Sequence, residues 1–217
     1  MSKILLVDID NTILDFNKAE RMALLPILEE YNLVSEENIN LYSKINLSYW
    51  KRFEKKEITR EECVTLRWTE FFLHFGLNID GKELHDKYFK RLREGAFYME
   101  GAEEFLKRAS KEYKIYAVTN GIADVQHNRI NKIGLDKYLE KAYISEEIGF
   151  QKPEKEFFDY VLNDIHANKE DVIVLGDSLS SDIQGAINAN LDYIWFDYKN
   201  SDPSYKKRIT KLMDFFK

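Results

Sequence analysis

The stretch Lys3-Ile-Leu-Leu-Val-Asp-Ile-Asp-Asn-Thr-Ile-Leu14 decides the fold. Its apolar run, Ile4 to Val7, predicts a strand buried on both faces, as a parallel sheet requires. Two carboxylates, Asp8 and Asp10, follow directly. Side chains two residues apart on an extended strand point the same way, so these charges would repel each other. Ligands of open α/β sheets bind beyond the carboxyl ends of strands. We therefore expect a cation or a reacting group there; the alternative is a strand-end turn with solvated aspartates.

Composition indicates an ordinary globular protein. The chain has 217 residues, 44% hydrophobic and 32% charged, enough for one large domain or a domain with an insert. A net charge of −6 argues against a broadly basic nucleic-acid-binding face. No apolar run has the length of a membrane span, and the N-terminus enters the first strand directly, so we expect no export. The single cysteine, Cys63, excludes an intrachain disulfide and fits the cytoplasm.

Residues 17–97 show helical spacing and no strong strand signal. A capping-box pattern, Thr59-Arg-Glu-Glu62, marks the start of one helix. The block predicts an all-helical insert behind the first strand, with helices over 18–31 (kinked at Pro26), 35–56, 59–76 and 80–93.

After Gly101, strands alternate with helices, which predicts a doubly wound parallel sheet. The fold class is therefore α/β, a Rossmann-like sheet with an inserted α-helical domain. The expected strands are 114–120, 142–145, 171–177 and 193–196, the last of which closes the sheet. The expected helices are 102–111, 124–133, 154–165, 180–189 and 207–216.

Polar residues follow three of the predicted strands and can cooperate in one chemistry. Carboxylate oxygens of Asp8 and Asp177 suit Mg²⁺, and a carboxylate beside that ion can attack phosphorus. Thr119, the backbone N–H of Asn120 and the side chain of Lys152 would hold the phosphoryl oxygens. Asp10 would protonate the leaving oxygen and then activate water. Asp182 follows Asp177 by five positions.

The same residues carry a family resemblance. Asp8-Ile-Asp-Asn-Thr12, Thr119, Lys152 and Gly176-Asp-Ser-Leu-Ser-Ser-Asp182 stand in the order of the four motifs of the haloacid dehalogenase superfamily of phosphohydrolases. The resemblance covers the whole chain, because the helical insert is similar to the mobile C1 cap of that family. It implies a catalytic core of residues 1–16 with 98–217 and a cap of residues 17–97.

The resemblance also implies roles for single residues. Asp8 would be the nucleophile and Asp10 the general acid and base. Mg²⁺ would be held by the Asp8 side chain, the Asp10 backbone carbonyl and Asp177. Asp182 would hold a metal-bound water or Lys152.

Longer stretches resemble bacterial pyrimidine 5′-nucleotidases of the noncanonical-nucleotide type. We assign Phe16 and Trp50 to the nucleobase and Gly121 to the substrate; packing within the cap is the alternative for the aromatic residues. The stretches that carry this resemblance are Tyr49–Glu54, Ile58–Thr59, Val118–Gly121, Arg129–Leu135, Ile144–Gly149 and Lys152–Tyr160.

The sequence therefore favours a cytoplasmic, Mg²⁺-dependent phosphomonoester hydrolase that acts through an aspartyl phosphate, with a pyrimidine nucleoside 5′-monophosphate as substrate. We expect a monomer or homodimer that binds neither a nucleic-acid polymer nor a membrane. A sugar-phosphate or phosphoglycolate-type phosphatase is the alternative, and a phosphomutase a lesser one. Dehalogenases of the family lack an acid where Asp10 stands. A receiver-type signalling domain has its phospho-accepting Asp on a later strand and no such insert. An inert binding module is disfavoured because no motif position is missing.

Overall fold

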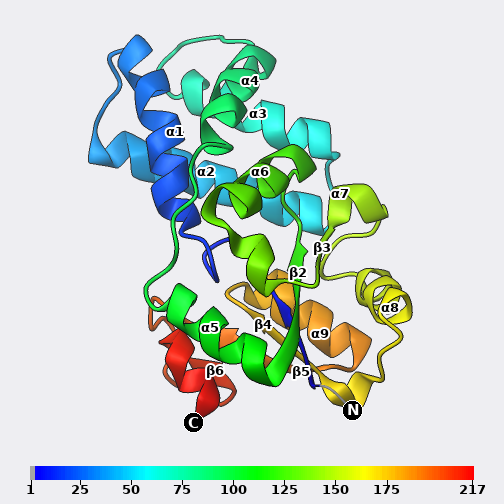
Figure 1. Ribbon diagram of the computed structural model, residues 1–217. Helices are drawn as coiled ribbons and strands as arrows, with labels where there is room; N and C mark the ends of the chain where they lie inside the picture. The colour runs from blue at the N-terminus through cyan, green and yellow to red at the C-terminus, as the bar shows by residue number, and fades with distance from the viewer. Residues whose placement is uncertain (1–2) are drawn as a thin grey trace. The chain divides into compact units, whose positions relative to one another are not determined.

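The computed structural model describes residues 3–217 and consists of two compact units (Figure 1). One unit contains the residues up to Phe16 together with Ala96–Lys217, and the other is Asn17–Gly95. The insert thus ends at Gly95, whereas the sequence placed its end at residue 97. Its role as a cap remains a prediction.

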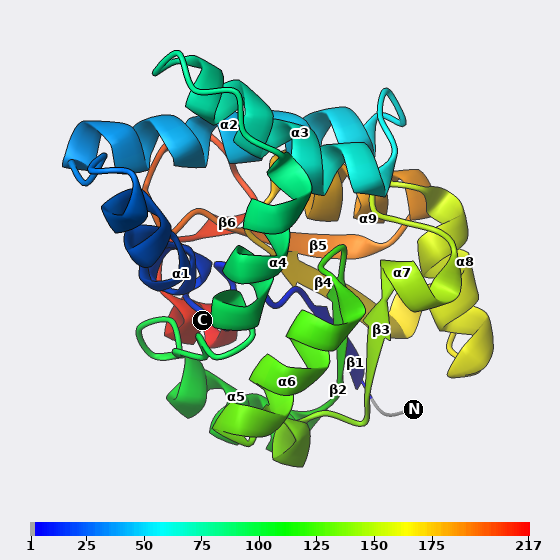
Figure 2. The same ribbon diagram turned by 90° about the horizontal axis from the view of Figure 1, so that it is seen from above.

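The larger unit is built on a parallel sheet of six strands, in the order β3-β2-β1-β4-β5-β6 (Figure 2). This arrangement confirms the predicted fold class. Strand β1 lies between β2 and β4, and both neighbours run parallel to it, so the carboxyl ends of these three strands are adjacent. The strands are β1 (Lys3–Val7), β2 (Tyr113–Thr119), β3 (Lys141–Ile144), β4 (Val172–Gly176), β5 (Asp192–Phe196) and β6 (Arg208–Ile209).

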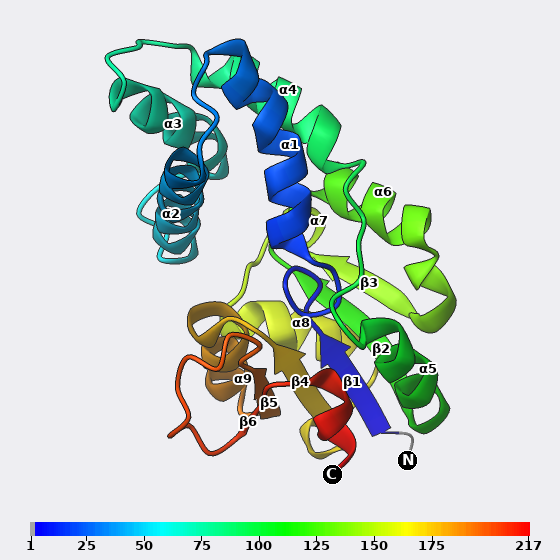
Figure 3. The same cartoon turned by 90° about the vertical axis from the view of Figure 1, so that its left-hand side faces the viewer.

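Helices cover both faces of the sheet because β1 is apolar on both (Figure 3). Leu5 and Val7 pack in a core with α5 (Ala102–Glu112) and with residues of α6 (Ala123–Ile133). Side chains of alternate residues on a strand point to opposite faces. Accordingly, Ile4 and Leu6 pack in a second core. The helices of that core are α8 (Lys155–Asp164) and α9 (Gln184–Ala189), and α7 (Ser145–Ile148) follows β3.

The smaller unit contains the four predicted helices, and three of them begin at the side-chain caps that the sequence supplies. Ser35 caps α2, and Asp80 caps α4. The predicted capping box is present at the start of α3. The Thr59 hydroxyl accepts a hydrogen bond from the Glu62 N–H, and the Glu62 carboxylate accepts one from the Thr59 N–H. Helix α1 runs through Pro26 without ending there. The helices are α1 (Phe16–Glu30), α2 (Glu36–Glu54), α3 (Arg60–Leu73) and α4 (Gly81–Leu92).

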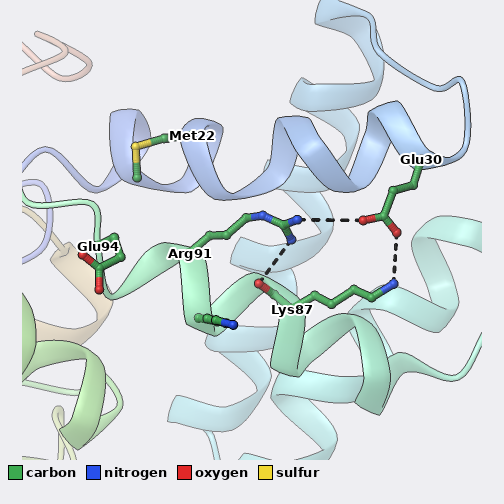
Figure 4. A pocket seen from close by; sticks show the side chains of 6 residues that line it. Met22, Glu30, Lys87, Arg91 and Glu94 are labelled. Atoms are coloured by element: carbon green, nitrogen blue, oxygen red, sulfur yellow. Dashed lines mark hydrogen bonds and ion pairs between the residues drawn. The ribbon is translucent and has the colours of Figure 1, made fainter.

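A hollow of about 520 Å³ lies on the smaller unit between α1 and α4 (Figure 4). Glu30 of α1 forms ion pairs across it with Lys87, at 3.0 Å, and with Arg91, at 3.8 Å. These acids and bases largely neutralise each other at a partly exposed surface. No residue that lines this hollow is among the predicted site residues, so it gives no support to a substrate role.

The C-terminal part of the fold differs from the prediction. The expected helix over 207–216 is wrong, and so is the expectation that residues 193–196 close the sheet. Arg208–Ile209 instead forms the edge strand β6 beside β5, and a 3₁₀ helix follows at Leu212–Phe216. The apolar residues of this turn pack on α5: Phe215 and Phe216 contact Phe105, with ring centroids 5.4 and 5.6 Å from it.

Irregular turns connect the remaining elements. A π-helical turn precedes α9, and this element type occurs frequently at functional sites. The π-helical turn is Leu179–Ile183, and further 3₁₀ helices are Leu135–Tyr138 and Lys169–Asp171.

Candidate active site

The predicted site residues lie where the three central strands end. Asp8 follows β1, Thr119 ends β2, and Asp177 follows β4. The backbone N–H of Asp8 donates to the carbonyl of Leu175 at 2.9 Å, which continues the pairing of β1 with β4 by one residue. Ligands of doubly wound sheets bind at this edge, where crossover loops leave a crevice.

Lys152 is buried among oxygen atoms of this edge, with 2% of its surface exposed. Its ammonium group lies 2.7 Å from Asp8 Oδ1, 2.6 Å from Asp182 Oδ1 and 2.8 Å from the carbonyl of Val118. A lysine has three donors and no acceptor, so these three oxygens satisfy it completely. The structure therefore brings Asp8, Lys152 and Asp182, which are far apart in sequence, into direct contact.

The site contains more carboxylates than ammonium groups, and the pKa values of two of these carboxylates are raised. Burial, aided by the charges of Asp182 and Asp10, raises the pKa of Asp8 to about 7 in spite of Lys152. Burial and the charge of Asp8 also raise the pKa of Asp177 well above its usual value. Burial alone would lower the pKa of Lys152, but Asp182 and Asp8 outweigh it and raise this pKa, so the lysine remains cationic.

This acidic cluster fits a divalent cation. Carboxylate oxygens of Asp8, Asp177 and Asp182 all lie within 4.8 Å of one another. Hard oxygen donors of this kind are the ligands of Mg²⁺, which binds through one or two carboxylates together with substrate phosphate and water. Both oxygens of Asp182 already accept hydrogen bonds, from Lys152 and from the backbone N–H of Ser178 at 3.0 Å. Asp182 is therefore better placed to hold Lys152 than to bind a metal ion directly.

Two small local features allow Asp182 to approach. Gly176 ends β4, and a Cβ atom at this position would lie only 2.3 Å from Asp182 Cγ. Only glycine leaves space for the carboxylate there. Ser178 accepts a hydrogen bond from the N–H of Ser181 and so caps the π-helical turn that carries Asp182.

Asn120 contacts Lys152 through its side chain. The amide Nδ2 donates to the carbonyl of Lys152 at 2.7 Å, and Oδ1 accepts from the Lys152 N–H at 2.9 Å. Thr12, for which the sequence predicted no contact, donates its hydroxyl to Asp8 Oδ2 at 3.1 Å. Both contacts fix groups around the Asp8 carboxylate.

Asp10 has a different set of partners. Strand β1 ends at Val7, before either acid, so the assumption of one extended strand through Asp8 and Asp10 is wrong. The chain turns there, because the N–H groups of Ile13 and Leu14 both donate to the carbonyl of Ile9.

The Asp10 carboxylate instead faces helix α6. It forms an ion pair with Arg129 and accepts a hydrogen bond from Gln126 Nε2 at 2.9 Å. Sequence reasoning missed both residues. Their spacing of three on a predicted helix places them on one face, but it does not show that this face turns toward Asp10.

The three predicted substrate residues lie in different surroundings. Phe16 is the first residue of α1 but belongs to the larger unit, and its ring centroid lies 5.9 Å from Arg129 Cζ. Gly121 lies against Gln126, since a Cβ there would be 2.5 Å from Gln126 Nε2. Trp50 is on α2 of the smaller unit and packs edge-on to Phe53 at 5.8 Å. Their contact with substrate remains a prediction.

The chain is similar to known proteins over most of its length. Over 213 residues the chain is 35% identical to the pyrimidine 5′-nucleotidase PynA of Streptococcus pneumoniae, covering 94% of this chain and 90% of PynA. It is 30% identical over 196 residues to the pyrimidine 5′-nucleotidase YjjG of Escherichia coli, covering 87% and 83%. A crystal structure of the HAD-hydrolase YfnB of Bacillus subtilis bound to magnesium superposes with a TM-score of 0.91 at 34% identity, over 99% of this chain and 97% of YfnB.

These relatives confirm the family and the group that the sequence resembles. The model of the haloacid dehalogenase-like hydrolases matches residues 5–196, which span all four motifs and both units. The chain belongs to the haloacid dehalogenase-like hydrolase family and is an enzyme of that class.

Proposed function

We propose that this hydrolase is a Mg²⁺-dependent phosphomonoesterase that acts through an aspartyl phosphate on Asp8, with pyrimidine nucleoside 5′-monophosphates as substrates. The observation that carries the chemistry is the buried contact of Asp8 with Lys152 beside a second and a third carboxylate. The pyrimidine specificity rests on the two nucleotidases to which the chain is similar.

The metal ion would be held by the side chains of Asp8 and Asp177 and by the backbone carbonyl of Asp10. When bound, Mg²⁺ supplies positive charge that offsets the carboxylates and the phosphate. The acidic cluster needs such an offset, because burial raises the pKa of Asp8 to about 7, and the nucleophile must be ionised.

Asp8 is positioned as a nucleophile by its two contacts. Lys152 holds one carboxylate oxygen and Thr12 the other, so the group has a fixed orientation. An Asp8 oxygen forms a bond to phosphorus while the ester P–O bond breaks, and the protonated form of Asp10 gives its proton to the leaving alcohol. Asp10 then removes a proton from water, which attacks phosphorus and releases phosphate from Asp8. The Thr119 hydroxyl and the Asn120 N–H donate to the phosphoryl oxygens. Lys152, whose three N–H groups are bonded to protein oxygens, stabilises them through its positive charge.

The helical unit, residues 17–95, is assigned to substrate selection in this proposal. It would act as a cap and present Trp50 to the base.

No helix within residues 3–217 is long and apolar enough to cross a membrane. A small phosphorylated metabolite in the cytoplasm is the substrate class that we propose.

The test is phosphate release by the purified protein from a panel of phosphate esters with Mg²⁺ present. The panel contains UMP, dTMP and CMP, purine monophosphates, sugar phosphates, phosphoglycolate and 4-nitrophenyl phosphate. We expect the highest kcat/KM for a pyrimidine nucleotide, loss of turnover in EDTA, and its return with Mg²⁺. A preference for a sugar phosphate would overturn the nucleotidase assignment and keep the phosphatase assignment. Absence of phosphate release from every ester would overturn both.

A further inference from the structure

One buried amide links the two sides of the site. Gln126 Nε2 donates to Asp10 Oδ2 at 2.9 Å and to Thr119 Oγ1 at 2.7 Å, which uses both hydrogens of the amide. Arg129 Nη1 donates to Gln126 Oε1 at 3.2 Å, so the amide oxygen has a partner as well. Gln126 is 1% exposed and Arg129 is fully buried. The predicted acid and the predicted phosphate-binding hydroxyl therefore share one donor.

This contact determines what the Thr119 hydroxyl can do. Its oxygen accepts from Gln126 Nε2 and also from the N–H of Gly121, at 3.0 Å. A hydroxyl group has two acceptor lone pairs and one proton. With both lone pairs occupied, its remaining capacity is to donate that proton. Thr119 is thus prepared as a hydrogen-bond donor, which is what an anionic phosphoryl oxygen requires.

Arg129 completes the arrangement from the next turn of α6. It forms the ion pair with Asp10 and lies beside the ring of Phe16. Space for the amide is provided by Gly121, because a Cβ there would come within 2.5–2.8 Å of three Gln126 side-chain atoms. If Gln126 and Arg129 only filled space beside α6, apolar side chains would serve equally well, and no hydrogen bonds to Asp10 and Thr119 would be needed.

We propose that Gln126 and Arg129 are positioning residues: Gln126 holds Asp10 and directs the Thr119 proton toward the substrate phosphate, and Arg129 holds Asp10. This proposal rests on the proposed phosphatase function. It assigns two effects to Gln126, on phosphate binding and on leaving-group protonation, and only the second to Arg129.

The test compares Gln126→Leu and Arg129→Met on two esters: the best alkyl phosphate found for wild type and 4-nitrophenyl phosphate. An alkyl leaving group needs a proton, whereas 4-nitrophenolate departs without one. Loss of a hydrogen bond to a charged group corresponds to a factor of about ten or more. We expect the ratio of alkyl to aryl kcat to fall about tenfold in both variants. KM should rise for both esters in Gln126→Leu and stay near the wild-type value in Arg129→Met.

The ratio of two kcat values from one preparation does not depend on the folded fraction, so destabilisation cannot produce the expected result. Gln126→Glu and Arg129→Lys keep the side-chain size and serve where the first variants are insoluble. We expect Gln126→Glu to lower the ratio, because a carboxylate repels Asp10, and Arg129→Lys to retain more of it than Arg129→Met. Asn131→Leu is the matched control, an amide-to-leucine change on the exposed face of α6.

An unchanged ratio in the variants at both positions would overturn the proposal and leave the two residues as packing of α6. Equal loss on the two esters with unchanged KM would overturn it as well. Failure of the proposed function itself would be visible earlier, as absence of phosphate release by wild type.

Discussion

The side chain of Asn120 and the backbone of Lys152 exchange two hydrogen bonds, at 2.7 and 2.9 Å, across 32 positions of sequence. This reciprocal pair connects the end of β2 to the loop before α8. It holds the peptide groups from which the Lys152 side chain reaches Asp8 and Asp182. The position of the Lys152 ammonium group therefore depends on Asn120, although the Asn120 side chain itself need not contact the phosphate.

Replacement of Asn120 by alanine tests this dependence. The variant keeps the backbone N–H at position 120, but the N–H and the carbonyl group of Lys152 lose their side-chain partners. We expect kcat to fall about ten- to a hundredfold, because the Lys152 ammonium group is no longer held in position beside Asp8. The melting temperature should also decrease, since the two part-buried backbone groups lose their partners at a cost of about 1–3 kcal/mol each. Steady-state kinetics with 4-nitrophenyl phosphate measures it. Asn131→Ala, at an exposed position of α6, is the control. Wild-type kinetics in Asn120→Ala would show that the pair does not position Lys152.

Asp8→Asn should abolish turnover while the protein remains folded. An amide has nearly the same size, cannot form the aspartyl phosphate, and removes a negative charge from an acidic cluster. We expect kcat to fall by many orders of magnitude, and the melting temperature of the metal-free protein not to fall. More than a few per cent of residual activity, after contaminating phosphatases are excluded, would contradict the covalent mechanism.

Asp10→Asn should affect esters according to their leaving group. General acid or base catalysis contributes about 10²–10⁴-fold, and an aryl leaving group needs no proton. We expect a larger loss of kcat on an alkyl phosphate than on 4-nitrophenyl phosphate. The asparagine oxygen can still accept from Arg129, so the local structure should persist. Equal losses on both esters would remove Asp10 from the acid role.

The metal-free protein should lose stability as pH rises toward neutrality. The pKa of Asp8 is about 7 in the folded protein and 3.8 when exposed. Between these values the folded state retains a proton that the unfolded state has lost, so the contribution of Asp8 to stability is present at low pH and decreases through this window. Asp182, Asp10 and Asp177 oppose the Asp8 charge, and Lys152 favours it.

Thermal unfolding in EDTA between pH 5 and 8 measures this effect. We expect the melting temperature of wild type to decrease more with pH than that of Asp8→Asn, and Mg²⁺ to restore wild type most strongly at pH 8. Parallel curves for the two proteins would show that Asp8 does not titrate in this range.

The sequence was sufficient to predict that Asp8, Thr119 and Asp177 lie at the carboxyl ends of three strands of a parallel sheet. Buried-strand patterns identify the strands, and parallel strands place their carboxyl ends at one edge. The same reasoning could not find Gln126 and Arg129. A polar residue on a helix usually faces solvent, and their partner Asp10 is more than a hundred positions away. Burial of these polar residues is a property of tertiary packing, so sequence periodicity alone does not show it.

The end of the chain was mispredicted for a related reason. Leu212, Phe215 and Phe216 have a spacing that fits a helix face, but their contacts with α5 are made from a 3₁₀ turn. The preceding residues pair with β5, where Arg208 also forms an ion pair with Asp197 at 2.8 Å. A strand of two residues is too short to give an alternating pattern.

Specificity for the base should depend on the helical unit, because the phosphate chemistry lies in residues of the other unit. Trp50 is partly exposed on α2, and its ring packs edge-on against Phe53. Stacking of a base on an aromatic side chain contributes about 1–3 kcal/mol in nucleic-acid complexes. We therefore expect Trp50→Ala to raise KM for UMP or dTMP roughly ten- to a hundredfold, and to leave KM for 4-nitrophenyl phosphate nearly unchanged.

Trp68 gives the comparison for this variant, because it is fully buried in the same unit and its ring lies 4.4 Å from Tyr42. A Trp68→Phe change perturbs the helical core without removing an exposed ring, so it should reduce stability and affect both substrates alike. If Trp50→Ala also affects the nucleotide and the aryl phosphate to the same degree, Trp50 is part of the packing of α2 and does not stack on the base. A selective effect on the nucleotide would place the base at Trp50, since only that substrate carries a pyrimidine ring.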